Sequence, residues 1–81
     1  MKIVITENAE KSYFDITNKY SETKAALFSK NTVSILDMIQ HNNHIGSKYK
    51  KTFYRKFLVS NQVYLFYKIE QNIIYIVFIL G

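Results

Sequence analysis

The chain has 81 residues, 48% of them hydrophobic, and a formal net charge of +5. This composition fits one small domain covering residues 1–81, and it excludes a disordered chain, a disulfide framework and a thiolate metal site, since there is no cysteine. The opening segment is too short for a signal peptide, and the longest apolar run, residues 73–80, is far below the roughly 20 residues of a membrane helix, so we expect a cytoplasmic protein without membrane contact.

A strand and then a helix are expected at the N-terminus. Residues 2–5 form a short apolar, β-branched stretch, and Thr6 follows at the position of a helix N-cap. Glu7 and Glu10 place negative charge at the positive end of this helix, which explains them without a catalytic role. Apolar residues then recur every three or four positions as far as about Tyr20, which predicts one amphipathic helix.

A second helix is expected after a short polar break. Ser21 or Thr23 is suited to cap it, and the stretch of Asn, His and Gly at residues 41–46 contains helix stop signals. Two helices joined by so few residues should form an antiparallel hairpin. Such a hairpin is wide enough to cover one face of a small sheet.

The last third of the chain predicts a three-stranded antiparallel meander. Residues 53–60, 63–70 and 73–80 are runs of β-branched and aromatic residues, separated by the two-residue breaks at 61–62 and 71–72. Breaks this short join antiparallel neighbours. The last run is apolar on both faces, which is typical of a central strand or of one that a partner covers. If it pairs with the N-terminal strand, it lies inside a four-stranded sheet. The expected fold class is therefore α+β.

A partner surface is expected on the sheet, because one helical hairpin covers only one of its faces. The other face would expose aromatic residues, among them Phe57, Tyr64 and Phe66. Contiguous exposed apolar surface usually marks a binding site for a partner. The alternative is ordinary packing, within a homodimer or under a further helix.

A basic cluster precedes and enters the first strand of the meander. Its members are interleaved with aromatic residues and are Lys48, Lys50, Lys51, Arg55 and Lys56. Such a cluster suits a polyanion or an acidic protein partner. The alternative is a solvated basic edge that only aids solubility.

Other site chemistry has little support in the sequence. His41 and His44 are close enough to share a metal, but no third ligand is near, and His residues are common at helix ends. Gly46 and Gly81 are the only glycines, so there is no phosphate-binding glycine loop. No cofactor, metal or catalytic residue is expected.

The chain resembles the RelE/ParE superfamily of bacterial toxins. The stretches that carry the resemblance are residues 4–10, 44–46, 54–59, 63–69 and 74–80. The resemblance implies the toxin of a type II toxin–antitoxin (plasmid stabilisation) system, neutralised by a cognate antitoxin that wraps it. RelE-like members cut mRNA on the ribosome with basic residues and a late Tyr, whereas ParE-like members inhibit DNA gyrase.

The nuclease residues of RelE-like members are largely missing. Arg55 stands at the first basic position of that set, but Phe57 and Tyr64 stand at the next two, and the sequence ends at Gly81 without a further Arg and Tyr. Phosphodiester cleavage needs a base, an acid and charge stabilisation at the phosphate. The departures favour a ParE-like protein that binds gyrase and is not an enzyme. A ribosome-dependent mRNA endonuclease and an inactivated, toxin-like binding module remain the alternatives.

The resemblance also suggests how the two surfaces would be used. The basic cluster would contact the target, and an antitoxin tail would cover the aromatic residues Phe57, Tyr64 and Phe66 or add a strand to a sheet edge. The expected assemblies are a homodimer or a hetero-oligomer of toxin and antitoxin.

Overall fold

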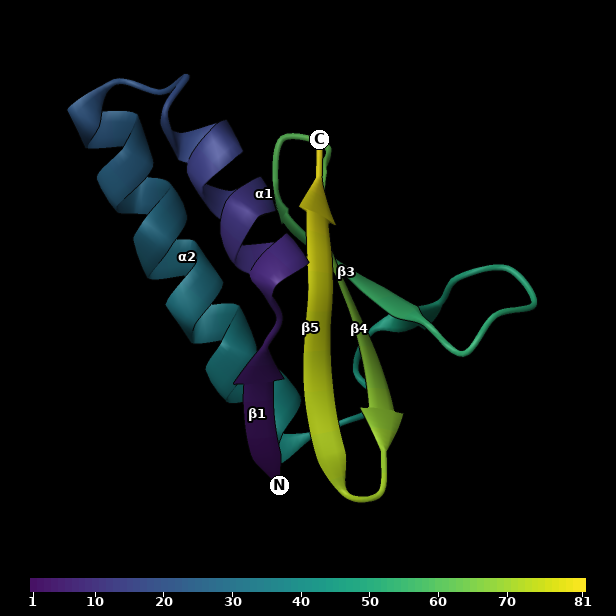
Figure 1. The fold of residues 1–81 in the computed structure, drawn as a ribbon. Helices are drawn as coiled ribbons and strands as arrows, with labels where there is room; N and C mark the ends of the chain where they lie inside the picture. Colours follow the sequence, from purple (N-terminus) through teal and green to yellow (C-terminus); the bar gives the residue numbers. More distant parts are fainter.

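The computed structural model describes all 81 residues as two helices and a sheet (Figure 1). Both helices lie on one face of the sheet, as expected. No helix is long and apolar enough to cross a membrane. The elements in chain order are β1 (Lys2–Ile5), α1 (Glu7–Thr17), α2 (Glu22–His41), β2 (Ser47–Lys48), β3 (Arg55–Ser60), β4 (Val63–Glu70) and β5 (Ile73–Leu80).

The sheet differs from the expectation in strand number and in direction. It has five strands in the order β1-β5-β4-β3-β2, and it is mixed, because β1 runs parallel to β5 while the other pairs are antiparallel. The chain returns through α2 before the last three strands reverse in turn, which leaves β5 in the direction of β1 (Figure 1). Of the two possibilities left open for the last strand, the structure shows the central position, between β1 and β4.

The additional strand, β2, comes from the basic segment before the meander, where no strand was expected. Ser47 and Lys48 pair with Lys56 and Arg55 at the edge of the sheet. A hydrogen bond of 2.9 Å from the Tyr49 amide to the Tyr54 carbonyl, just before β3, closes the loop between the two strands. The first strand of the meander therefore begins at Arg55, two residues later than expected.

The two hairpins of the meander turn through pairs of residues with positive φ. These φ angles are 37° and 67° at Asn61 and Gln62, and 50° and 63° at Gln71 and Asn72. Two consecutive residues in this region are typical of type I′ turns, whose twist matches that of antiparallel strands. The turns thus join the strands as the sequence predicts, although Gln is an unusual residue for this conformation.

The helix N-caps are those that the sequence predicts. The side chain of Thr6 accepts a hydrogen bond from the Ala9 amide, and that of Ser21 accepts one from the Lys24 amide, each at 3.2 Å. The first helix ends at Thr17, three residues before the expected Tyr20. The chain there closes into a tighter turn, in which amides bond to carbonyls three residues earlier.

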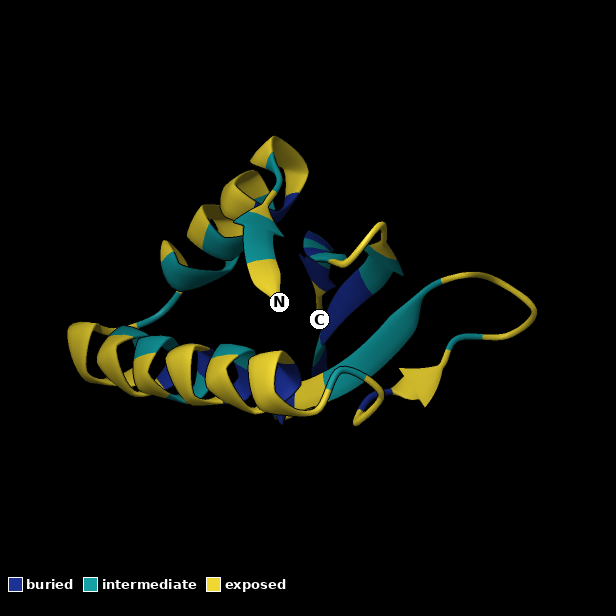
Figure 2. Cartoon of the chain, turned by 90° about the horizontal axis from the view of Figure 1, so that it is seen from below, coloured by how far each residue is buried: buried dark blue, intermediate teal, exposed yellow.

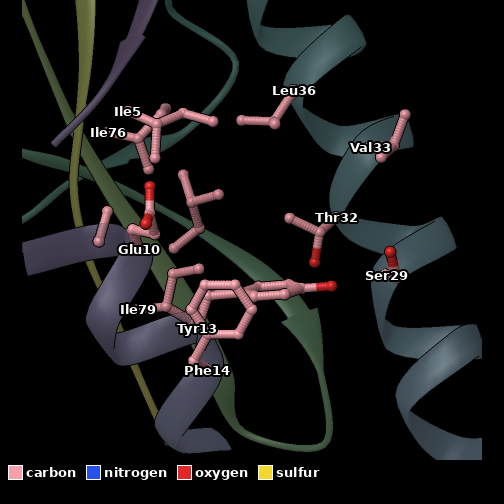
Figure 3. A pocket seen from close by; sticks show the side chains of 12 residues that line it. Ile5, Glu10, Tyr13, Phe14, Ser29, Thr32, Val33, Leu36, Ile76 and Ile79 are labelled. Carbon is pink, nitrogen blue, oxygen red and sulfur yellow. The ribbon is translucent and has the colours of Figure 1, made fainter. Parts of the chain in front are cut away.

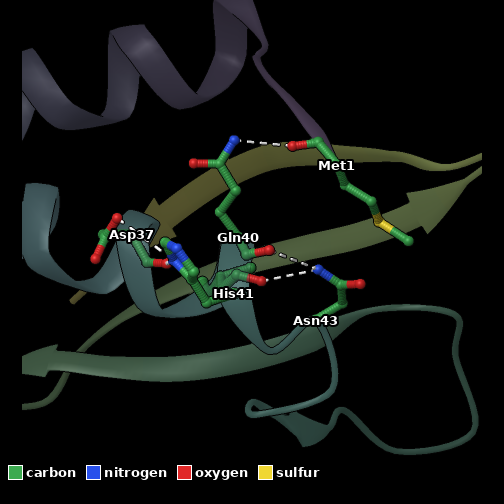
Figure 4. A network of polar contacts seen from close by, with 6 residues as sticks. Met1, Asp37, Gln40, His41 and Asn43 are labelled. Atoms are coloured by element: carbon green, nitrogen blue, oxygen red, sulfur yellow. Dashed lines mark hydrogen bonds and ion pairs between the residues drawn. The ribbon is translucent and has the colours of Figure 1, made fainter.

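Side-chain amides secure the end of α2 (Figure 4). Asn43 Nδ2 donates to the carbonyls of Ile39 and Gln40 at 2.9 and 3.3 Å, and Gln40 Nε2 donates to the carbonyl of Met1 at 2.9 Å. His41 lies one turn from Asp37, with Nδ1 3.5 Å from a carboxylate oxygen. No group of three His, Asp or Glu residues is placed to hold a metal.

The core lies between the helices and the sheet. In Figure 2 the buried stripe of α2 faces inward and its exposed stripe faces out. Leu65, Tyr67 and Ile74 from the two central strands are fully buried there, and Ile39 of α2 meets them. This apolar layer occupies one face of the sheet, and other residues form the opposite face.

Candidate functional site: the open face of the sheet

The sheet face turned away from the helices carries aromatic residues and lysines. Side chains of directly paired residues lie on the same face, so the strand register defines its members. Lys56 pairs with Phe66, which pairs with Phe78, and Lys68 pairs with Tyr75. We call the following set the open face: Lys56, Leu58, Tyr64, Phe66, Lys68, Tyr75 and Phe78.

The loop between β2 and β3 adds two tyrosines to the open face. The Tyr49 ring meets the Phe66 ring edge-on at 5.1 Å between centroids, and the Tyr54 ring lies 6.2 Å from that of Phe78. The Phe66 and Phe78 rings are 4.7 Å apart. These contacts leave Phe66 buried and build an aromatic platform rather than a bare apolar sheet.

Two lysines of the open face lie over tyrosine rings. Lys56 Nζ is 4.6 Å from the ring centroid of Tyr64 and 5.9 Å from that of Tyr49. Lys68 Nζ is 5.7 Å from the ring centroid of Tyr75. A cation beside an aromatic ring offers charge for a phosphate and a flat surface for a base, which is the combination that single-stranded nucleic acids bind.

Arg55 is half-buried and belongs to a polar cluster on the helix side of the sheet, not to the open face. Its Nη1 donates to the carbonyl of Gly46 at 2.7 Å and to that of His44 at 3.3 Å. The hydroxyl of Tyr67 donates to the Asn43 carbonyl and accepts from the Gly46 amide, each at 2.9 Å. These bonds fix the end of α2 and its loop to the centre of the sheet.

Burial raises the pKa of the Tyr67 hydroxyl above its ordinary value of 10.0, while the Gly46 amide and the charge of Arg55 oppose the rise. The hydroxyl is therefore protonated at neutral pH and is no general base. Gly46 has no room for a side chain, because a Cβ atom there would lie 2.8 Å from the Tyr67 ring and hydroxyl.

The structure separates the five basic residues expected to bind the target. Lys56 lies on the open face, while Arg55 points to the helix side and binds loop carbonyls. Lys48, Lys50 and Lys51 are exposed on β2 and the loop, with Lys50 Nζ 5.2 Å from the Tyr49 ring centroid. Their role in target binding stays a prediction, now centred on Lys56.

The three aromatic residues expected to bind a partner do not share one face. Phe57 pairs with Leu65 and packs against the core on the helix side. Tyr64 and Phe66 lie on the open face, and Phe66 is covered by its aromatic neighbours. Phe57 lies on the opposite face because its pairing partner is Leu65, which alternates with Tyr64 and Phe66 along β4. The sequence alone left this register open.

A second surface that the sequence analysis missed is an apolar groove between the helices (Figure 3). Its volume is about 430 Å³, and α1, α2 and the sheet all contribute to it. Tyr13 and Phe14 line it from α1, and Val33 and Leu36 line it from α2. Phe14 and Val33 are 52% and 64% exposed, although each continues the apolar stripe of its helix. That excess of apolar helix surface was the available signal.

The fold is similar to that of a solved toxin–antitoxin complex. A chain in the crystal structure of the heterotetrameric YoeB-YefM toxin-antitoxin complex from Staphylococcus aureus matches with a TM-score of 0.68 and 20% identity, covering 96% of this chain and 92% of that one. No family model and no curated protein matches the sequence. The likeness shows that this chain shares its fold with a chain of that complex.

Proposed function

We propose that this protein is the toxin of a toxin–antitoxin pair and that its open face binds single-stranded RNA. The observation that carries the RNA part is the position of Lys56, whose Nζ lies over Tyr64 and beside Tyr49 in the middle of an aromatic platform. The similarity to a chain of a toxin–antitoxin complex supports the toxin part.

The charge and the rings of the open face have complementary uses. Its lysines can neutralise phosphates, and each released counterion contributes to affinity. Its tyrosines can stack on bases of any sequence, at about 1–3 kcal/mol per base. An RNA strand crossing β3, β4 and β5 would meet Lys56 and Lys68 in turn, each with a tyrosine beside it.

RNA now replaces DNA gyrase as the proposed target. The gyrase expectation rested on the absence of basic residues at the positions of Phe57 and Tyr64. The strand register places two lysines on the open face, Lys56 in β3 and Lys68 in β4. Nothing in the fold or the comparison favours gyrase. The proposal therefore moves from the ParE-like to the RelE-like side of the resemblance.

A direct binding measurement tests the RNA proposal. Fluorescence anisotropy with a labelled single-stranded RNA of mixed sequence should show binding that weakens as salt rises. A gyrase supercoiling assay and a gel of the RNA after incubation separate the other mechanisms. Intact RNA that stays unbound at low salt, together with inhibited supercoiling, would overturn the RNA proposal in favour of gyrase.

We further propose that the antitoxin covers the groove between the helices with an apolar helical segment. The groove is an open concavity of about 430 Å³ with a mostly apolar lining, whereas Phe57 and Phe66 are engaged inside the protein. Amphipathic helices commonly bind such grooves through residues spaced three and four apart. The structural neighbour is itself a complex of toxin and antitoxin.

Co-purification tests the groove with a matched pair of variants on α2. Val33→Glu places a charge in the groove, while Lys30→Glu places one on an exposed position of the same helix. We expect the protein encoded beside this gene to co-purify with the wild type and with Lys30→Glu, but not with Val33→Glu. Equal recovery with all three would exclude the groove.

A further inference from the structure

A small basic pocket lies at the end of the sheet, away from the groove between the helices. Strand β3 begins at Arg55, which pairs with Tyr67, so Lys68 and Ile69 of β4 have no partner on that side. The loop that follows β2 closes over this gap. The resulting pocket has a volume of about 220 Å³ and is lined by His44, Lys48, Thr52, Phe53, Tyr54, Arg55, Lys68 and Ile69.

The lining of this pocket is positively charged. Lys48 and Arg55 line it from the helix side of the sheet, and Lys68 lines it from the open face beyond the start of β3. No carboxylate lines it. Arg55 uses only Nη1 for its two loop carbonyls, so its Nη2 and Nε make no hydrogen bond within the chain. Lys68 Nζ also pairs with the Glu70 carboxylate at 3.2 Å. Three cations against one neighbouring carboxylate favour an anion.

An exposed aromatic ring stands at the rim of the same pocket. Phe53 is 94% exposed, more than any other large apolar residue of the chain. The protein covers little of this ring, although the ring lines the pocket. A flat, free ring beside a basic pocket is suited to stack on a nucleobase.

We propose that this pocket binds one nucleotide, with its phosphate among Lys48, Arg55 and Lys68 and its base on the ring of Phe53. The volume is below the roughly 300–1,000 Å³ that encloses a drug-sized ligand, so it suits a phosphate and a sugar with the base outside. The nucleotide is either free or part of an RNA strand. In the second case the pocket extends the open face, and this part of the inference rests on the proposed function.

Adenosine 5′-monophosphate is the probe that tests the pocket without RNA. In amide NMR spectra of the full chain, it should shift the signals of His44, Lys48 and Phe53, while adenosine should shift them far less. Lys48→Gln should weaken this binding about five- to tenfold, since a charged hydrogen bond is lost. Lys11→Gln, on the exposed side of α1, is the matched control and should bind as the wild type does.

Substitutions of Phe53 test the contact between its ring and the base. Phe53→Ala should lower the affinity for adenosine monophosphate about fivefold, because the contact with the base is lost. The affinity for inorganic phosphate should stay unchanged. Phe53→Trp should restore the affinity, and its fluorescence should be quenched on binding. Adenosine monophosphate that shifts only Tyr64 and Tyr75, or that binds Lys48→Gln and Phe53→Ala as tightly as the wild type, would overturn the pocket.

Competition assigns the source of the nucleotide. Adenosine monophosphate that weakens RNA binding places a residue of the RNA strand in the pocket, whereas unchanged RNA binding assigns the pocket to a free nucleotide. RNA binding that depends on Lys56 but is accompanied by no binding of the mononucleotide removes the pocket and keeps the proposed function. Mononucleotide binding without any RNA binding keeps the pocket and removes the proposed RNA-binding function.

Discussion

The two faces of the sheet are made by alternate residues of the same strands and have opposite properties. In β4, Leu65 and Tyr67 are fully buried under the helices, while Tyr64 and Lys68 next to them remain partly exposed on the open face. One face is mainly apolar and packs against the helices, and the other combines rings with charge. Stability and binding should therefore respond to different residues that are adjacent in sequence.

The largest effect is expected in the covered face. Leu65→Ala removes a fully buried side chain from the middle of the core and should lower the free energy of unfolding by about 3 kcal/mol. Leu58→Ala is the matched control, because Leu58 is 50% exposed on the open face, and it should cost less than about 1 kcal/mol. Urea denaturation measures both. Equal losses would show that the two faces do not differ in packing.

A glycine under the covered face gives the next largest effect. In Gly46→Ala, the new Cβ would meet the Tyr67 ring and hydroxyl at 2.8 Å and the Lys56 carbonyl at 2.9 Å, which should cost about 2 kcal/mol of unfolding free energy. Gly81→Ala is the control, since its Cβ would meet its nearest neighbour at an ordinary 3.4 Å. A thermal unfolding midpoint unchanged by Gly46→Ala would mean that the loop moves freely against Tyr67.

On the open face, a charge change should affect binding and spare stability. Lys56→Gln should reduce the slope of log affinity for RNA against log salt by about 0.7, because one fewer phosphate is neutralised. Its unfolding free energy should stay within about 0.5 kcal/mol of the wild type. Lys30→Gln, on the helix side, should leave the salt slope unchanged. A slope unaffected by Lys56→Gln would move the RNA to another surface.

The smallest effect belongs to a turn that serves neither face. Gln62 has φ 67°, where a side chain is unfavourable, so Gln62→Gly should raise the free energy of unfolding by about 0.5–1 kcal/mol. Gln62→Ala keeps the Cβ atom and should bring no gain. A loss of stability in Gln62→Gly would indicate that the glutamine side chain makes a stabilising contact.

Local rules were enough to predict much of this fold. The N-cap Thr6 and the two short hairpin turns follow from residue type and spacing. Ser21 was one of two candidates for the second N-cap, and the inner position of the last strand was one of two possibilities. The position of the Arg55 side chain could not be predicted in this way. An arginine that binds two loop carbonyls looks the same in the sequence as one that is free to bind a ligand. Phe57 and Tyr64 lie on opposite faces of the sheet because of the strand register, which the sequence did not determine.

The sequence by itself determined the hydrophobic periods, the turns and the net positive charge, because each depends on neighbours a few residues apart. Only the tertiary structure decided which lysine lies among the tyrosines, that the helices leave a groove between them, and that β3 starts late enough to open a pocket beside β4. These features arise between segments far apart in the chain. A shift of one residue in strand register moves every side chain to the other face, and only packing against the helices fixes that register.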